Sequence, residues 1–130
     1  MDTLSLCQFV YGPAWQLLGP QDMLELLVAA TGWDLSIDDI QLYGKRRVNL
    51  MRALNVREGL TRAADTLPKK LFYKPLEGGP SDGIALDEGE FHAGLNMYYE
   101  QAGWDLENGV PNRDTLEEIG LAWVADELKL

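Results

Sequence analysis

Cys7 is the side chain of this sequence best suited to metal or redox chemistry, because it is the only thiol in the chain. Thiolates bind iron and zinc, yet a lone cysteine in an apolar stretch such as Leu4 to Val10 is more often a small buried hydrophobic residue. His92 has no second histidine or cysteine at metal-ligand spacing and falls beside the apolar stripe of a predicted helix. This pattern indicates an ordinary helical histidine.

Two further groups of residues could form a ligand site. The four tryptophans and five tyrosines could line a pocket. Aromatic residues at helical spacing are nevertheless more often part of a core. Gly78, Gly79 and Gly83 follow no predicted strand and precede no phosphate-binding consensus, which argues against a nucleotide-binding loop.

Length and charge restrict the possible classes of protein. A chain of 130 residues with 46% hydrophobic and 25% charged residues is expected to fold as one domain, spanning residues 1–130. Its net charge of −10 disfavours binding to nucleic acid or to anionic lipid, although it could suit a basic partner.

The sequence also indicates a compartment. One cysteine excludes an internal disulfide framework and fits a reducing environment, so we expect a cytoplasmic protein. No apolar run approaches the ~20 residues of a membrane span, and the N-terminus lacks the features of a signal peptide.

Caps, stops and apolar periodicity predict an all-α, compact multihelical domain without strands. Pro20 starts a helix that runs to about Ala30 and is closed by Gly32. That helix is apolar nearly all round, which predicts a buried, central element. Ser36 then begins a long helix that ends at Gly59.

The second half of the chain continues the helical pattern. Pro75 to Gly89 is the one long loop candidate, and Asp87 can cap the next helix. The stripe from Phe91 to Ala102 is amphipathic, and Gly103 can end it. Two short helices should follow, from Asn112 to Gly120 and from Leu121 to Leu128.

The long helix after Ser36 carries both an apolar stripe and a run of charges. The stripe predicts a core-facing side, and it comprises Ile37, Ile40, Gly44, Val48, Met51 and Asn55, widened by Tyr43, Leu50 and Leu54. The charges fit a solvated face, or alternatively an arginine-organised corner in which Arg57, Arg62 and Asp65 tie the helix end to the Asp65–Pro68 turn. The corner would be architectural rather than catalytic.

Several separated motifs, spread from Asp2 to Leu128, together resemble the C-terminal region of the tungsten-containing aldehyde ferredoxin oxidoreductase family. The motifs are Asp2-Thr-Leu-Ser-Leu-Cys7, Asn55-Val-Arg-Glu-Gly59, Arg62, Asp65-Thr-Leu-Pro68, Tyr98-Tyr99, Gly103-Trp-Asp105, Gly109-Val-Pro111, Leu116 and Gly120-Leu121.

The resemblance implies a role for three residues. In that family an Asp-x-x-Gly-Leu-Cys motif binds a tungstopterin through its aspartate, which implies that Asp2 binds this cofactor. The cysteine of the motif is the last ligand of a four-iron four-sulfur cluster, which implies this role for Cys7. The following residue touches the pterin, which would be Gln8. The sequence departs from the family pattern at Ser5, in place of glycine, and at Lys70, in place of a common arginine.

The resemblance implies a part of an enzyme that oxidises aldehydes to carboxylic acids and passes electrons to ferredoxin. The other cluster cysteines would lie upstream of Met1, so the chain looks like a fragment that is inactive alone and needs the N-terminal domains of the same enzyme. Its first apolar residues would then be exposed or covered by a second copy of the chain; they are Leu4, Leu6, Phe9, Val10 and Tyr11. The alternatives are a family relative acting on another substrate, such as an aromatic acyl-CoA, and a free-standing acidic helical interaction module that lost its cofactors.

Overall fold

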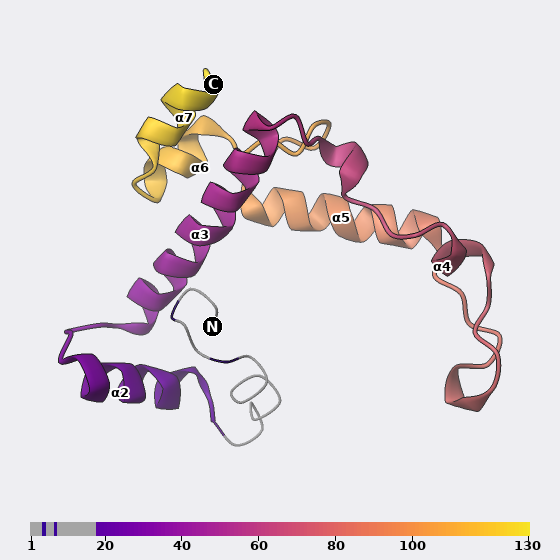
Figure 1. Cartoon of the computed structure of the whole chain (residues 1–130), viewed down its shortest axis with the longest axis horizontal. Coiled ribbons are helices and arrows are strands. Elements are labelled where there is room, and N and C mark those ends of the chain that lie inside the picture. Colours follow the sequence, from indigo (N-terminus) through magenta and orange to yellow (C-terminus); the bar gives the residue numbers. More distant parts are fainter. Residues whose placement is uncertain (1–3, 5–6, 8–17) are drawn as a thin grey trace.

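The computed structural model describes Leu4, Cys7 and residues 18–130. Within these residues the regular structure is helical, and the only strand-like pairing is an isolated bridge between Trp104 and Pro111. The all-α prediction is therefore confirmed. Figure 1 shows the α-helices α2 (Pro20–Thr31), α3 (Ile37–Arg57), α4 (Lys70–Tyr73), α5 (Glu88–Ala102), α6 (Arg113–Glu118) and α7 (Ala122–Leu128), with the 3-10 turns η3 (Arg62–Ala64) and η4 (Gly79–Ser81).

The helix ends follow from local chemistry. The Ser36 hydroxyl accepts the backbone N–H of Asp39 at 3.2 Å, and the Asp39 carboxylate accepts the backbone N–H of Ser36 at 2.8 Å. This capping box satisfies two donors that a helix start would otherwise leave unpaired. The Asp87 carboxylate caps α5 with a single bond, accepting the backbone N–H of Glu90 at 2.8 Å, so both predicted caps are confirmed.

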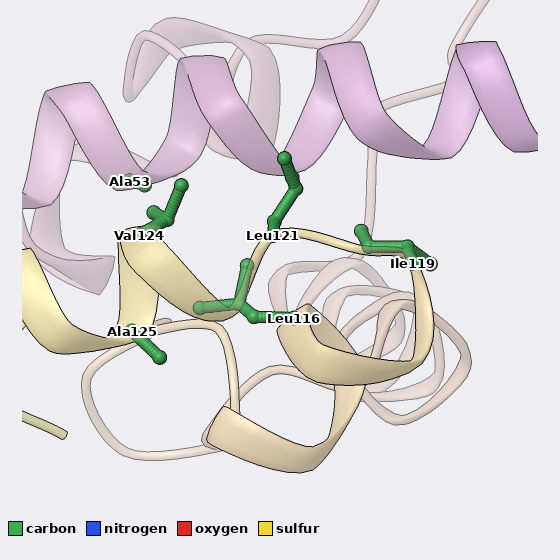
Figure 2. Packing of buried hydrophobic residues seen from close by; sticks show 6 residues of the cluster. All are labelled: Ala53, Leu116, Ile119, Leu121, Val124 and Ala125. Carbon is green, nitrogen blue, oxygen red and sulfur yellow. The ribbon is translucent and has the colours of Figure 1, made fainter.

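A small hydrophobic core joins the C-terminal part of α3 to α6 and α7. Figure 2 shows its six buried residues, with Ala53 on α3 and the others on α6, α7 and their connection. Leu42 and Leu128 pack against this cluster from its edge. The buried residues are Ala53, Leu116, Ile119, Leu121, Val124 and Ala125.

The prediction of a central, buried helix at α2 is wrong. Figure 1 places α2 at the opposite end of α3 from α6 and α7. Only Met23 and Leu24 of α2 are buried, and Leu26 is exposed. Apolar residues all round a helix indicate burial only when enough chain is present to cover every face.

The predicted core-facing stripe of α3 is also wrong over its C-terminal half. Val48, Met51 and Asn55 are exposed, whereas the buried positions of this helix are Asn49, Arg52 and Ala53. The protein therefore turns a largely polar side of α3 inward, and this side meets partners that satisfy its hydrogen bonds.

The segment between α3 and α5 extends away from the core (Figure 1). Residues 74–87 contain only the η4 turn, so the predicted loop is confirmed there. Two backbone hydrogen bonds, between Leu76 and Ile84 at 2.8 Å and between Gly83 and Leu76 at 2.9 Å, close the tip of this loop.

Candidate functional site

The cofactor-binding residues implied by the resemblance lie at the N-terminus. Asp2 and Gln8 fall outside the described residues, so their roles stay predictions. The same holds for Leu6, Phe9, Val10 and Tyr11. Leu4 is half-buried in the structure.

Cys7 is exposed and its thiol is free. Among the residues that the structure describes, no group of three or more His, Cys, Asp or Glu side chains could hold a metal ion. Because a four-iron cluster takes four thiolates, the residues of this chain fit such a cluster only as the source of one ligand, at Cys7.

Arg52 lies at the centre of a buried network that joins four segments of the chain. Its two terminal nitrogens bind the Asp65 carboxylate at 3.0 and 2.8 Å. Its Nε donates to the carbonyl oxygen of Gly109 at 2.7 Å, and Nη2 also donates to the Tyr99 hydroxyl at 3.2 Å. The side chain thus fixes α3 against the Asp65 turn, α5 and the loop before α6. The planar guanidinium suits this role because its donors match a carboxylate in pairs.

Aromatic rings complete the surroundings of Arg52. Its guanidinium carbon lies 4.9 Å from the centroid of the Trp104 ring and 5.6 Å from that of Tyr99. The Tyr99 hydroxyl in turn donates a short hydrogen bond to Asp65. A cation held between aromatic faces and a carboxylate is well stabilised away from water.

The pKa values of the Asp65 carboxyl and the Tyr99 hydroxyl are shifted in opposite directions. Burial by itself raises the pKa of Asp65, but hydrogen bonds from Arg52 and Tyr99 and the charges of Arg52 and Arg62 outweigh it, so the pKa lies below its usual value. Burial and the hydrogen bond to Asp65 raise the pKa of Tyr99. Around neutral pH the network therefore contains an ionised carboxylate and a neutral phenol.

A second buried polar pair lies one turn earlier on α3. The Trp104 indole N–H donates to the Asn49 side-chain oxygen at 2.9 Å. The Asn49 amide donates to the carbonyl oxygen of Lys45 at 3.0 Å. Asn49 and Arg52 thus explain why a polar side of α3 is buried, since each meets specific partners.

The loop from Asp105 to Pro111 presents its backbone to Arg52. The Asp105 carboxylate accepts the N–H groups of Glu107 and Asn108 at 3.0 and 2.9 Å, which closes the turn. Gly109 follows with φ of 75°, and a Cβ at this position would lie 2.0 Å from Nη2 of Arg52. Glycine is required here because both the left-handed backbone and the close approach exclude a side chain.

Arg62 forms a second tie in the same region. It donates to the Asn96 side-chain oxygen at 2.6 Å and to the carbonyl oxygen of Leu106 at 2.5 Å. Its guanidinium carbon lies 4.9 Å from the Tyr99 ring centroid. The predicted arginine-organised corner is therefore present, with Arg62 and Asp65 in it.

The prediction that Arg57 belongs to this corner is wrong. Its side chain is 52% exposed and pairs with the neighbouring Glu58 at 3.0 Å. The central arginine is Arg52, which sequence reasoning missed because it sits among residues interpreted as a solvated face. The available signal was its position three residues after Asn49 and one before Ala53, which places all three on one side of the helix.

The buried network and the motifs of the resemblance coincide in space. Asp65, Tyr99, Trp104 and Gly109 each come from a different motif, and all four contact Arg52. Gly103, from the motif of Trp104, packs so tightly that a Cβ there would lie 2.1 Å from the Thr115 hydroxyl. These motifs therefore specify an architecture, because each of the three guanidinium nitrogens of Arg52 binds a partner.

His92 lies on α5, as the sequence predicts. It is exposed, and its ring meets the edge of the neighbouring Phe91 ring at a centroid distance of 5.4 Å. This environment agrees with the ordinary helical histidine that the sequence indicates.

An open cleft of about 410 Å³ lies beside the middle turns of α3, between Gly44 and Asn49, where α5 ends and α6 passes. Lys45 and Glu118 contribute charges of opposite sign to its lining, and Tyr98 contributes a ring. The cleft could admit a small polar molecule, but these groups do not form a catalytic arrangement.

None of the described helices is long and apolar enough to cross a membrane.

Comparison with known proteins connects the chain to one family of enzymes. It is 36% identical over 124 residues to the tungsten-containing aldehyde ferredoxin oxidoreductase of Pyrococcus furiosus, covering 94% of this chain and 19% of that protein. The same figures hold for the enzyme of that name from Thermococcus kodakarensis. A Pyrococcus furiosus protein named aliphatic sulfonate oxidoreductase, WOR-like subunit, is 31% identical over 134 residues, covering 98% of this chain and 20% of that protein.

The chain spans about a fifth of the length of these relatives. Its residues 1–121 match the family model described as aldehyde ferredoxin oxidoreductase, domains 2 and 3. This match covers most of the sequence, and the chain therefore belongs to the aldehyde ferredoxin oxidoreductase family.

Proposed function

We propose that this chain forms the C-terminal helical part of an oxidoreductase that oxidises aldehydes to carboxylic acids, with ferredoxin as electron acceptor. Family membership supports this, and the match begins at residue 1, so it includes the segment from Asp2 to Cys7. When bound, a tungstopterin would supply the two-electron oxidation and an iron–sulfur cluster the onward electron transfer.

Three residues would carry the contribution of this chain. Asp2 and Gln8 would bind the pterin, and Cys7 would give one thiolate to the cluster. The exposure of Cys7 supports this role, because a cluster held mainly by other thiolates must reach its sulfur atom. With both functions on one short segment, electrons would pass from metal to cluster over a short route.

The Arg52 network would provide the rigid support for this segment. Positioning groups act efficiently only when the elements behind them are fixed, and Arg52 fixes α3 through bonds to three other segments. No residue of the network would touch substrate.

The partners of the chain follow from its incomplete ligand set. The N-terminal domains of the same enzyme would supply the remaining thiolates and the rest of the pterin site. The isolated chain is then expected to hold neither cofactor and to be inactive.

We place the enzyme in the cytoplasm, in keeping with one cysteine in 130 residues. The apolar N-terminal segment could in addition contact a second copy.

A chimera tests the proposal. The 124 matched residues of the Pyrococcus furiosus aldehyde ferredoxin oxidoreductase would be replaced by this chain, and iron, tungsten and aldehyde-dependent viologen reduction would be measured anaerobically. We expect Cys7→Ser to remove the cluster and the activity, while Trp33→Ser, at an exposed site, keeps both. A Cys7→Ser chimera with undiminished iron and turnover would contradict the proposal.

The isolated chain provides a second test. After anaerobic reconstitution it should remain free of metal, and its thiol should react with one equivalent of an alkylating reagent because Cys7 is exposed. Stoichiometric metal together with turnover would contradict the proposal that its ligand set is incomplete.

The 31% identity to the sulfonate oxidoreductase subunit supports a second candidate, an enzyme of the same family that acts on another substrate class. An aromatic acyl-CoA reductase is a further possibility of this kind, and a cofactor-free helical interaction module is the remaining alternative. A panel of aldehydes, alkyl sulfonates and aromatic acyl-CoA thioesters, given to the chimera, would separate the enzymatic candidates. If the chain is instead a cofactor-free interaction module, Cys7 should have no role in the reaction of any of these substrates.

A further inference from the structure

Leu4 is half-buried although it lies near the start of the chain, three residues before Cys7. It lines a groove of about 560 Å³ between α2 and α3. Leu27 from α2 and Tyr43 from α3 line the same groove, and both are also half-buried. Removing a leucine side chain from water against two helices is favourable, so the groove holds this point of the N-terminal segment.

One wall of the groove belongs to the part of the fold that is fixed most firmly. Tyr43 lies on α3, and Arg52 ties the same helix to three other segments. Trp33 also lines the groove, but it is 60% exposed, so the seat of Leu4 depends more on Leu27 and Tyr43. A residue seated in this groove is therefore connected to the Arg52 network through α3.

The covalent chain then restricts where Cys7 can lie. A polypeptide spans at most about 3.6 Å per residue, so the Cα atoms of Leu4 and Cys7 are no more than about 11 Å apart in any conformation. Cys7 itself is exposed, so burial of its own side chain contributes little to its placement. Seating of Leu4 thus limits the positions that the Cys7 sulfur atom can reach.

We propose that Leu4 is a positioning residue, whose side chain between α2 and α3 holds the Cys7 sulfur where an iron–sulfur cluster can bind it. The identity of the cluster rests on the proposed function, whereas the seating of Leu4 does not. A four-iron cluster takes four thiolates and this chain has one, so its thiolate must meet a cluster held mainly from elsewhere. Holding the segment in advance lowers the entropy that binding would otherwise cost.

A nitroxide label on Cys7 tests the seating in the full 130-residue chain without cofactors. Cys7 is the only thiol and is exposed, so a thiol-specific label attaches there alone. The electron paramagnetic resonance spectrum should be dominated by the slow motion of a held segment. Leu4→Ala removes most of a half-buried side chain and should raise the fast-moving fraction by about tenfold. Leu4→Met conserves apolar volume and should keep the wild-type spectrum.

Three further variants separate the seat of Leu4 from a general loosening of the chain. Leu27→Ala removes the α2 side of the seat and should raise the fast-moving fraction as Leu4→Ala does, while circular dichroism checks that the helices persist. Because both leucines line one groove, the double variant should add little to either single change. The matched control is Leu76→Ala, since Leu76 is 55% exposed and lies outside the groove, and it should leave the spectrum unchanged.

The chimera with the Pyrococcus furiosus enzyme tests the consequence for the cluster. Its iron would be followed during incubation with a chelator, which reports on the cluster without depending on turnover. Leu4→Ala should lose iron several-fold faster than the unchanged chimera, and Leu4→Met should restore the slow loss. Leu76→Ala should again have no effect.

Three results would overturn the proposal. A wild-type nitroxide spectrum that shows only the fast motion of a free chain end would exclude the seat, and so would equal spectra for the wild type and Leu4→Ala. A Leu4→Ala chimera that keeps its iron as long as the unchanged chimera would exclude the positioning role. Undiminished iron in the Cys7→Ser chimera would instead count against the proposed function, so the two failures are distinguishable.

Discussion

Arg52 and Arg113 each hold distant parts of the chain together with several hydrogen bonds, yet they do so in opposite environments. Arg113 binds Glu117 at 3.2 Å, Asp126 at 2.9 Å and the carbonyl oxygen of Leu130 at 2.8 Å. Its side chain is 38% exposed, whereas that of Arg52 is 7% exposed. Similar numbers of bonds therefore need not mean similar contributions to stability.

The difference lies in what remains when the arginine is removed. Around Arg113, water can hydrate Glu117 and Asp126 at little cost. Around Arg52, the Asp65 carboxylate, the Tyr99 hydroxyl and the Gly109 carbonyl would lose a buried donor that water replaces poorly. The buried Arg52 network thus specifies one arrangement of its four segments. The exposed Arg113 network adds little to the stability of the fold.

The largest expected effect is from Arg52→Ala. Removing one partner of a buried ion pair costs about 3 to 5 kcal/mol, which is a large part of the stability of a small domain. Because the Asp65 side chain is 28% exposed, we expect a loss at the lower end of this range. Urea unfolding followed by circular dichroism would measure this loss. Arg52→Lys keeps the charge but loses the paired donors, so we expect it to be intermediate. An Arg52→Ala variant as stable as the wild type would show that the network is dispensable.

Gly109→Ala should have the next largest effect, because it disturbs the same network from the backbone. The new methyl group would collide with Nη2 of Arg52. In addition, the backbone φ of 75° at position 109 is strained for any residue other than glycine. Overpacking and strain together suggest a cost of about 3 kcal/mol. Gly59→Ala is the matched control, since Gly59 has φ of 90° with nothing within 4 Å, and backbone strain alone should cost about 1 kcal/mol. Equal losses at both glycines would show that the contact with Arg52 does not matter.

Local signals in the sequence predicted the helices well. Ser36 and Asp87 as caps depend only on residues within one turn, and the structure confirms both. Gly32 and Gly103 end their helices in the left-handed conformation, as predicted. Such features are readable because the interacting groups are neighbours in the chain.

The buried face of α3 could not be predicted in this way. Arg52 is buried because Asp65, Tyr99 and Gly109 surround it, and these partners lie 13, 47 and 57 residues away. Periodicity assigns the apolar side of a helix to the core, but here Met51 and Leu54 on that side are exposed. Pairings over such distances depend on the tertiary fold, and for Asp2 and Gln8 the family resemblance alone supplied a role.

The pH dependence of stability should show the contribution of Asp65. Because its pKa is lowered in the folded state, its contribution is complete above the unfolded value of about 4 and is lost as the pH falls through the lower folded value. Urea midpoints measured from pH 6 down to pH 2 should fall less steeply for Asp65→Asn than for the wild type. Asp39 also has a lowered pKa, through its hydrogen bonds with Ser36, so part of the decline should persist in that variant. Parallel curves for the two proteins would contradict this assignment.

The smallest expected effect is from Arg113→Ala, which completes the comparison. All side chains that it would leave behind are already in contact with solvent, since Glu117 and Asp126 are 49% and 71% exposed. Hydration then replaces most of what the arginine provided, and the remaining interaction is screened by salt. We expect the urea midpoint to stay almost unchanged in 0.15 M salt and to differ least from the wild type in 1 M salt. A loss approaching that of Arg52→Ala would mean that bond number, rather than burial, decides the contribution of these arginines.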